Sequence, residues 1–325
     1  MKYLIITDHP RNDLRVSKSQ KYLDNVTLQI PPLMARFFWV PGYCSVVYLL
    51  TFFYRFDRIY AHDLFLSYAV IGRRKPVIAD LHENFYDCYN HSRFRFRWLR
   101  WFFRTERITK MIKAVEHRSY QLIVSSRLST EVYHTSLYYD NVQPPTVDLQ
   151  KIIVPERIVV FIGRNRDLES IDWLLIKQPF TLVVMSNNVP RLNVPLNINV
   201  IYTGSNSSYS EVNQYWLQRA MIGLLPHRPS SHIKTCSPNK LFTYMDNGIC
   251  VLYGSWMSNV HEIVSRYKCG YPVMVMGGCM TIEGGLQWLL YREKEARQIG
   301  QNGRAAVMNE YNEQKIIELL FKDLL

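Results

Sequence analysis

A lysine occupies an unusual place in the stretch SPNKLFTYMDNG, residues 237–248. Ser237 is a favourable N-cap, the proline after it suits a first helical position, and the closing Asn-Gly pair suits a helix end, so we predict a short helix. Lys240 then lies in the first turn, at the positive end of the helix dipole, where a cation is mildly unfavourable. A bound phosphate would compensate, because exposed backbone N–H groups and an ammonium both attract an anion. The alternative is a solvated surface lysine, since one motif needs structural context.

Polar side chains also follow predicted strands in the first half of the chain. The segment ADLHENF closes a strand with Asp80, His82 and Glu83, and Asp87 follows shortly after. Carboxylates and imidazoles at such an edge could deprotonate a hydroxyl, or could cap the next helix. Asp8–His9 and His62–Asp63 close two further strands. We therefore expect substrate contacts from His9, Asp13, His62 and Asp63, although ordinary loop polarity explains them almost as well.

The sequence lacks the usual metal-binding spacings. No Asp-x-Asp motif and no CxxC pair is present, and the six cysteines are scattered. We therefore expect no essential divalent ion, and reduced, mostly buried thiols in a cytosolic protein.

Short apolar runs alternate with segments of helical length from end to end, which predicts parallel sheets covered by helices on both faces. The predicted strands are Tyr3–Thr7, Val26–Ile30, Arg58–Ala61, Val77–Asp80 and Leu122–Ser125, then Ile158–Ile162, Thr181–Met185, Asn199–Tyr202, Met221–Leu225, Ile249–Tyr253 and Tyr271–Val275. The alternation falters in residues 138–156, which contain Pro144, Pro145 and Pro155. A chain of 325 residues fits two domains, and we expect their strand ends to face a shared cleft.

The expected domain bounds are 1–145 for an N-terminal Rossmann-like domain, 146–156 for a linker, 157–308 for a C-terminal domain and 309–325 for a closing helix. The closing helix is expected to pack back on the N-terminal domain.

Two segments raise the question of membranes. Residues 37–54 carry no charge, but Pro41–Gly42 interrupts them, and a spanning helix needs about 20 apolar residues. We expect a buried helix from Tyr43 to Tyr54 instead. The N-terminal run of five residues from Tyr3 is too short for a signal peptide and predicts a strand.

Residues 91–113 form a basic and aromatic stretch, in which arginines recur at helical spacing with tryptophans and phenylalanines on both flanks. That pattern is typical of an interfacial helix on anionic lipid. A helix with solvated arginines and packed aromatics is the alternative, and a groove for single-stranded nucleic acid has no supporting fold signature. The residues predicted to contact the membrane are Arg93, Arg97, Trp98, Arg100, Trp101 and Arg104. The formal charge of +12 also indicates an anionic partner.

The second half of the chain is similar to the donor-binding domain of GT-B glycosyltransferases, close to glycosyltransferase family 4. It carries SPNKLFTYMDNG followed by a strand, then a helix with EIV, and finally GQNGRAAV. In the first half, HPRNDLRV, FDRIYAHDL and VIADLHENF resemble motifs of the same family. The resemblance implies a GT-B fold, an α/β architecture of two doubly wound Rossmann-like domains.

The same resemblance implies roles for individual residues. Lys240 would hold the diphosphate of a nucleotide-sugar donor, with Arg164 reaching it from the opposite wall, and His82 would contact the donor sugar. The further donor-binding candidates are Gly163, Ser237, Asn239, Thr243 and Glu262, while Asp80 and Glu83 join His82 as catalytic candidates.

One departure from the family is visible. Many members carry two glutamates around the phosphate-binding loop, where this chain has Thr235 and Thr243. A hydroxyl can still bind a ribose, but without charge assistance the bond is weaker. This departure puts the donor pose and a retaining mechanism in doubt.

The sequence predicts a metal-independent, peripheral-membrane transferase of polysaccharide biosynthesis, with no cofactor. It would move a sugar from a nucleotide-diphosphate donor, UDP slightly favoured, to a hydroxyl of a lipid-linked glycan at the inner face of the cell membrane. Retention is favoured and inversion is the alternative. Two other functions stay open: a sugar-nucleotide epimerase of the same architecture, and a non-catalytic subunit that binds membranes or partners. Nucleic acid is not an expected partner.

Overall fold

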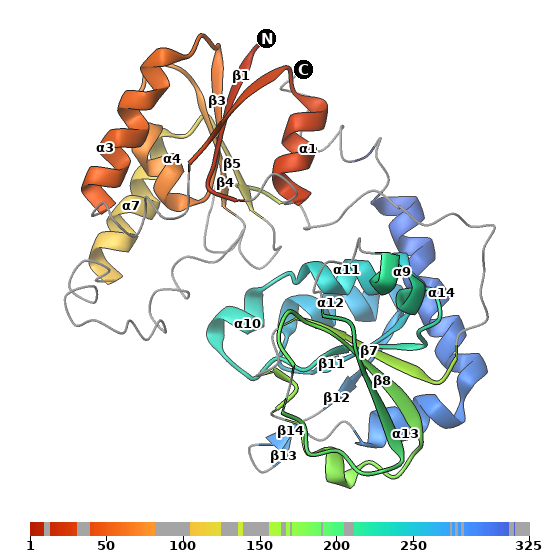
Figure 1. Ribbon diagram of the computed structural model, residues 1–325. Helices are drawn as coiled ribbons and strands as arrows, with labels where there is room; N and C mark the ends of the chain where they lie inside the picture. Colours follow the sequence, from red (N-terminus) through yellow and green to blue (C-terminus); the bar gives the residue numbers. More distant parts are fainter. Residues whose placement is uncertain are drawn as a thin grey trace. The chain divides into compact units, whose positions relative to one another are not determined.

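The computed structural model describes residues 1–9, 14–30, 40–81, 105–124, 136–138, 156–163, 167–169, 171–189, 191–204, 211–273, 275–276, 279–280, 283–311 and 315. The chain divides into two compact units: unit 1 comprises residues 1–141 and 316–325, and unit 2 comprises residues 142–315. Each unit contains a six-stranded sheet with helices on both faces (Figure 1), as the alternation of strands and helices predicts. The predicted linker and the predicted closing helix lie almost entirely outside the described residues.

The sheet of unit 1 is parallel and has the strand order β2-β1-β3-β4-β5-β6. Because the chain moves from β1 outward to β2 and then returns to the other side of β1, the direction of winding reverses between β1 and β3. The strands are β1 (Tyr3–Thr7), β2 (Asn25–Gln29), β3 (Arg58–His62), β4 (Val77–Leu81), β5 (Gln121–Val124) and β6 (Ser136–Tyr138). The helices are α1 (Leu14–Tyr22), α3 (Val40–Leu50), the 3-10 helix η1 (Thr51–Phe53), α4 (Leu64–Val70) and α7 (Thr105–Arg118).

Strand β1 shows how the sequence fills both faces of this sheet. All five of its residues are buried, and successive side chains point to opposite faces. Leu4 and Ile6 pack in the cluster that contains α3 residue Val47, whereas Tyr3 and Ile5 pack with Leu23 beyond α1. Figure 1 shows α3, α4 and α7 on one side of the sheet and α1 on the other.

The sheet of unit 2 is also parallel, with the order β12-β11-β10-β7-β8-β9, and its winding reverses between β7 and β10. The strands are β7 (Ile158–Ile162), β8 (Phe180–Met185), β9 (Ile198–Tyr202), β10 (Ile222–Leu225), β11 (Cys250–Gly254) and β12 (Gly270–Val273), and a small antiparallel hairpin is formed by β13 (Val275–Met276) and β14 (Cys279–Met280). The helices are η3 (Trp173–Leu175), α9 (Glu211–Leu217), α10 (Ser231–Thr235), α11 (Asn239–Asp246), α12 (Ser258–Tyr267), α13 (Glu283–Tyr291) and α14 (Glu293–Glu310).

The uncharged segment at 37–54 differs from its prediction. Helix α3 begins at Val40, so Pro41 lies in its first turn, where a missing N–H costs no hydrogen bond. Tyr43 and Val47 are buried as expected, but Phe52 and Phe53 in η1 are exposed. The expected buried helix up to Tyr54 is therefore wrong at its C-terminal end. Among the described helices, none is long and apolar enough to cross a membrane.

Four cysteines of the described part of the chain are free thiols: Cys44, Cys236, Cys250 and Cys269. Burial raises the pKa of Cys44 to about 11 and that of Cys269 to about 12. A raised pKa keeps a thiol protonated and unreactive at neutral pH. The expectation of buried thiols is confirmed for Cys250 and Cys269, whereas Cys44 and Cys236 are partly exposed.

The closing motif GQNGR lies inside α14, which continues to Glu310, and the domain boundary predicted at 308 stays a prediction. A Cβ atom at Gly300 would clash with the carbonyl oxygen of Gly248, at the end of α11. The glycine therefore permits close packing of α14 on the region between α11 and β11.

We expect Gly300→Ala to destabilise the protein by about 1–3 kcal/mol, because overpacking against backbone forces α14 away. Thermal unfolding followed by circular dichroism measures the change. Gly284→Ala is the matched control: it lies in α13, and an added Cβ meets nothing within 4 Å. The control should be neutral or slightly stabilising, because alanine favours a helix over glycine. Equal melting temperatures for the two variants would contradict the packing explanation.

Candidate functional site

Helix α11 forms as predicted from its apolar spacing, but it begins one residue late. The N-cap position is taken by Pro238, which makes no side-chain capping bond, so the prediction that Ser237 caps this helix is wrong. Leu241, Phe242 and Met245 are buried, as expected for one apolar face. Lys240 is the second helical residue and stays in the first turn.

The side chain of Lys240 reaches across to the carboxyl end of β7. Its ammonium lies 5.0 Å from the centre of the Phe161 ring. A Cβ atom at Gly163 would lie only 2.6 Å from the same Nζ atom, and Gly163 has a φ of +143°, which disfavours other residues. The glycine thus leaves room for the ammonium at the point where the winding of the sheet reverses, which is the usual ligand position in doubly wound folds.

Tyr244 fixes α11 against the same two strands. Its hydroxyl accepts a hydrogen bond from the backbone N–H of Ile162 in β7 at 3.1 Å and donates one to the carbonyl of Leu224 in β10 at 3.2 Å. Burial raises the pKa of this fully enclosed phenol, which therefore remains neutral. Sequence reasoning missed the role of Tyr244. Its position in the helix predicts a core residue, but does not show that its hydroxyl bonds to both β7 and β10.

The other residues predicted to bind the nucleotide-sugar donor lie on or near α11. Asn239 is exposed at its start, Ser237 is buried, and the Thr243 hydroxyl donates to the Asn239 carbonyl at 3.2 Å. Glu262 lies 3.6 Å from Arg266 on α12, and this helix begins without a side-chain cap. Arg164 lies outside the described residues.

Two features near this edge were not predicted. Helix α10 (Ser231–Thr235) is the first, and the Ser230 hydroxyl caps it by accepting a hydrogen bond from the Ile233 N–H. His227, just after β10, lies 3.3 Å from Asp167, while the indole N–H of Trp256 donates to the His227 carbonyl. The His-Asp pair joins segments distant in sequence, so no local pattern could reveal it.

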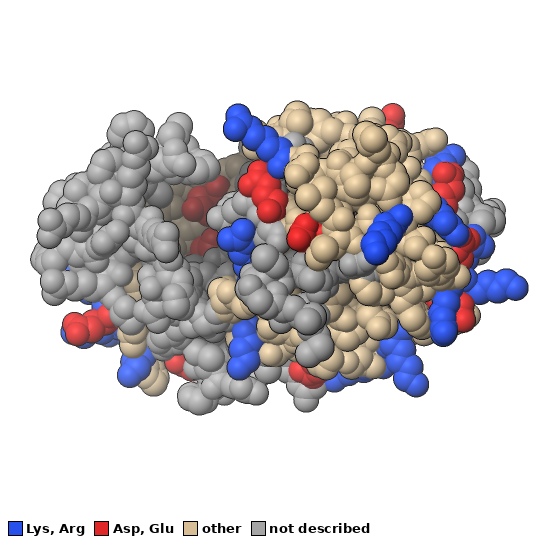
Figure 2. All heavy atoms as spheres, turned by 90° about the horizontal axis from the view of Figure 1, so that it is seen from below, with Lys and Arg blue, Asp and Glu red and all other residues tan. Residues whose placement is uncertain are grey.

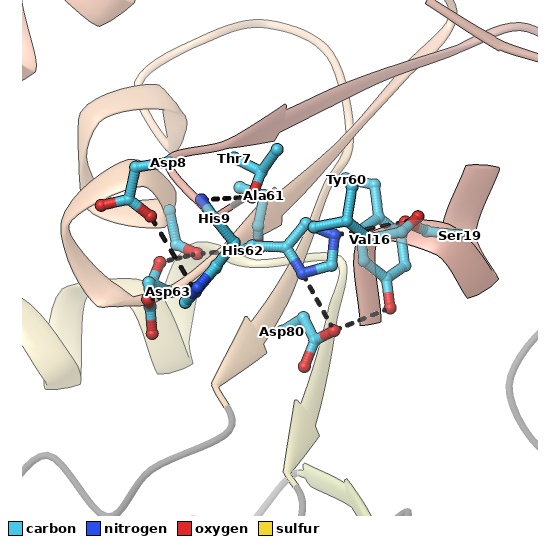
Figure 3. Close-up of polar contacts among 11 residues, drawn as sticks. Thr7, Asp8, His9, Val16, Ser19, Tyr60, Ala61, His62, Asp63 and Asp80 are labelled. Atoms are coloured by element: carbon cyan, nitrogen blue, oxygen red, sulfur yellow. Dashed lines mark hydrogen bonds and ion pairs between the residues drawn. The ribbon is translucent and has the colours of Figure 1, made fainter. Parts of the chain in front are cut away.

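In unit 1, three polar side chains meet where the winding reverses between β1 and β3 (Figure 3). Asp8 and His9 follow β1, and Asp63 follows β3. The His9 Nε2 atom lies 2.9 Å from an Asp63 carboxylate oxygen and 3.9 Å from one of Asp8. All three side chains are partly exposed, so the cluster is accessible from solvent.

The backbone of Asp63 is held in an unusual conformation, with a φ of +75°. Its N–H donates to the Asp80 carbonyl, and its own carbonyl accepts from the Ser67 N–H and hydroxyl. Positive φ in a residue other than glycine costs of order 1–3 kcal/mol and tends to occur at functional sites. Here the surrounding bonds hold the conformation that brings the carboxylate to His9.

A second, buried layer lies beneath this cluster. His62 has no solvent exposure; its Nε2 atom lies 3.2 Å from the Ser19 hydroxyl and its Nδ1 atom 3.4 Å from the Asp80 carboxylate. The Tyr60 hydroxyl donates to the same carboxylate at 3.1 Å (Figure 3). His62 is therefore closed to solvent, which argues against the direct substrate contact predicted for it. Asp80 is buried in the same network, which places it behind the surface rather than on it.

The cluster of Asp8, His9 and Asp63 could also hold a cation. One ligand atom each from Asp8, His9 and Asp63 lies within 4.8 Å of the others. Tyr43, which sequence reasoning missed, lies buried nearby, and its hydroxyl has no hydrogen-bond partner among the residues that the structure describes. Burial raises the pKa of Tyr43, and the Asp8 and Asp63 carboxylates raise it further. The expectation that no divalent ion is needed remains a prediction.

Several predicted site residues lie outside the described part of the chain: His82, Glu83, Asp87, Asp13, Arg164 and all six residues predicted to contact the membrane. On the face shown in Figure 2, the described lysines and arginines are spread out, with acidic side chains between them. The described lysines and arginines thus form no single patch on that face.

Known structures resemble the whole chain, although no protein-family model and no curated protein sequence matches it. HepE from Anabaena, solved in complex with UDP and glucose, has a TM-score of 0.65 at 12% identity, and the match covers 98% of both chains. Sucrose-phosphate synthase from Thermosynechococcus elongatus also has a TM-score of 0.65, at 13% identity over 97% of this chain and 96% of that one. A protein from Listeria monocytogenes assigned as a UDP-N-acetylglucosamine 2-epimerase has a TM-score of 0.51, at 10% identity over 95% and 94%.

These matches establish the fold. The chain has the two parallel-sheet α/β units of the GT-B glycosyltransferases, as the sequence motifs predicted. At identities of 10–13% the likeness carries the fold and nothing finer.

Proposed function

We propose that this chain is a glycosyltransferase that moves a sugar from a nucleotide-diphosphate donor, with UDP favoured, to a hydroxyl of a lipid-linked glycan. The observation that carries the proposal is the position of Lys240. Its ammonium lies beside Gly163 at the carboxyl end of β7, where the winding of the sheet reverses. A diphosphate bound there would meet both a cation and the first N–H groups of α11.

The donor side of the reaction follows from this geometry. As the bond between the sugar and the diphosphate breaks, negative charge grows on the leaving phosphate. The Lys240 ammonium is already held near that position by Phe161 beneath it, so it stabilises the charge without rearrangement. Arg164, directly after Gly163 in sequence, is proposed as a second cation for the same phosphates, and together the two would replace a metal ion.

The acceptor side is proposed to use His9 and Asp63. If His9 donates its Nε2 proton to Asp63, its Nδ1 atom carries the lone pair and can take a proton from an acceptor hydroxyl. Asp63 would hold the ring in this tautomer and stabilise the imidazolium that forms, as a carboxylate does behind a catalytic histidine. Asp8, 3.9 Å from the ring, would add to that stabilisation.

This geometry favours inversion over the retention expected from the sequence. A base that activates the acceptor for direct attack on the sugar gives one displacement, and therefore an inverted anomeric centre. NMR of the first product distinguishes the two outcomes, because the anomeric coupling constant differs between α and β linkages.

The remaining parts of the proposal are carried by the sequence. Residues 91–113 would place the enzyme on the anionic inner face of the cell membrane, in the cytoplasm, where a lipid-linked acceptor for polysaccharide synthesis is available. His82 and Glu83 are proposed to contact the reacting sugar.

A sugar-nucleotide epimerase is the second candidate function, and the resemblance to the Listeria protein supports it. An epimerase interconverts free nucleotide sugars, whereas a transferase needs an acceptor. Incubating the protein with a nucleotide sugar alone and following the sugar by NMR separates the two reactions.

Calorimetry with UDP, GDP, ADP and CMP tests the proposed function first. We expect one nucleoside diphosphate to bind and to raise the melting temperature. At a hundredfold excess over Kd, the bound nucleotide adds about 2.7 kcal/mol to the free energy of unfolding. Binding by none of the four would contradict a donor site, and would leave the non-catalytic subunit as the better description.

A further inference from the structure

Three large apolar side chains project from unit 1 at the end of α3 and in η1. Leu49 is 59% exposed, Phe52 57% and Phe53 83%. Their spacing of i, i+3 and i+4 places them on one side of the helical turn. Such side chains clustered on a surface mark a contact with another molecule.

Basic side chains surround these apolar residues. A hollow of about 510 Å³ lies next to η1, at the edge of the sheet where β1, β3 and β4 begin; its charged lining residues are Lys2, Arg55, Arg73, Lys75 and the single carboxylate Asp57. That carboxylate accepts a hydrogen bond from the Lys2 backbone N–H. Arg74 is exposed beside the hollow.

These cations outnumber the single carboxylate of the hollow, Asp57. In the part of the chain that the structure describes, none of the five side chains of Lys2, Arg55, Arg73, Arg74 and Lys75 forms an ion pair. Arg73 joins the two features, because its guanidinium lies 3.7 Å from the centre of the Phe52 ring. The hollow and the apolar residues therefore form one continuous surface, the η1 surface.

We infer that the η1 surface docks on an anionic phospholipid bilayer. Leu49, Phe52 and Phe53 enter the region between headgroups and acyl chains, while the cations contact lipid phosphates. Charge complementarity selects this partner. Lysines and arginines without ion pairs match anionic lipid headgroups, and the exposed aromatic rings beside them match the apolar acyl chains beneath those headgroups. The inference does not depend on the proposed transfer reaction, because lipid binding needs no donor. It is also separate from the membrane contact predicted for residues 91–113.

Vesicle flotation with the full-length protein tests this inference. The wild type should bind vesicles of phosphatidylcholine with phosphatidylglycerol, and should bind pure phosphatidylcholine vesicles much more weakly. The apolar variant Leu49→Ser/Phe53→Ser should lower the affinity at least tenfold. The charge variant Arg55→Gln/Arg74→Gln/Lys75→Gln should lower it about a hundredfold, because each cation near such a surface contributes about fivefold.

Matched variants on unit 2 control for general loss of apolar surface or charge. Leu174→Ser/Leu196→Ser removes two side chains at least as exposed as Leu49, and Lys177→Gln/Arg191→Gln/Lys294→Gln removes three exposed cations. Both should bind within twofold of wild type, and melting curves should show that all variants fold.

Three results would overturn the inference. If the wild-type protein does not bind anionic vesicles, the inference is excluded. Variants of the η1 surface that bind like wild type assign the docking to another segment, such as residues 91–113. If a single-stranded oligonucleotide binds more tightly than the vesicles, and the charge variant loses that binding, the surface recognises nucleic acid instead.

Discussion

Lys240→Ala is expected to weaken binding of the nucleoside diphosphate about 30- to 150-fold while leaving the fold intact. A hydrogen bond to a charged group contributes about 1.5–3 kcal/mol, and an ammonium held against a diphosphate belongs at the upper end of that range. Lys240 lies in the first turn of α11 with its apolar neighbours buried on the other side, so its removal leaves the helix packing unchanged. Calorimetric Kd values for the nucleotide selected by the panel provide the measurement.

Lys294→Ala is the matched control for this prediction, because Lys294 is likewise the second residue of a helix, α14, and is exposed. If the nucleotide binds only through the general attraction of anions to helix N-termini, neither substitution should weaken its binding. If it binds at the Lys240 site, only Lys240→Ala should weaken its binding. Equal affinities in wild type and Lys240→Ala would assign Lys240 to the solvated surface and remove the main support for the donor site.

The positions of the strands could be predicted from the sequence because most of them are continuous apolar runs bounded by polar turns. Strands β1 and β7 have the predicted bounds, since both are buried on two faces and leave no alternation to misinterpret. Strand β6 and the β13–β14 hairpin were missed, because they are only two or three residues long and their stability comes from pairing, not from local pattern.

The helix that carries Lys240 was predictable, whereas the partners of the lysine were not. Apolar spacing placed Leu241 and Met245 on the buried face, but the N-cap position falls on Pro238 and not on the predicted Ser237. The contacts of Lys240 with Phe161 and Gly163 depend on the pairing of β7 with β10. That pairing follows from the topology of the sheet, which no local residue pattern predicts.

The polar edge of unit 1 was predicted as a group of residues, but not in its two layers. His62 and Asp63 are adjacent in sequence, yet one is fully buried and the other reaches the surface, because His62 is the last residue of β3 whereas Asp63 leaves the strand with a φ of +75°. The buried ring of His62 lies between the Ser19 hydroxyl, 3.2 Å from Nε2, and the Asp80 carboxylate, 3.4 Å from Nδ1, and such polar neighbours lower the cost of burying it. Those partners come from α1 and β4, so sequence proximity could not reveal them.

His9→Gln is expected to lower the rate of sugar transfer by about 10²- to 10⁴-fold, the usual contribution of a general base, with little change in donor affinity. Glutamine keeps a polar side chain of similar length but cannot take a proton at neutral pH. The reaction is measured as nucleotide released from the selected donor in the presence of a membrane extract that supplies the acceptor.

Asp63→Asn provides the sharper test, because an asparagine can hold the ring but cannot stabilise an imidazolium. If Asp63 acts through His9, the double variant should be no slower than His9→Gln alone, since groups that act as a unit are not additive. His117→Gln, on the exposed side of α7, is the control and should transfer at the wild-type rate.

A chelator separates this mechanism from a metal site built of the same residues. With a His-Asp base, EDTA should leave transfer unchanged, and the two single variants should fail to recover when divalent cations are added. Loss of transfer in EDTA, restored by Mg²⁺ or Mn²⁺, would instead show that Asp8, His9 and Asp63 hold a cation. A rate that survives both His9→Gln and EDTA would remove this cluster from the chemistry and leave the base to be sought among the residues after β4.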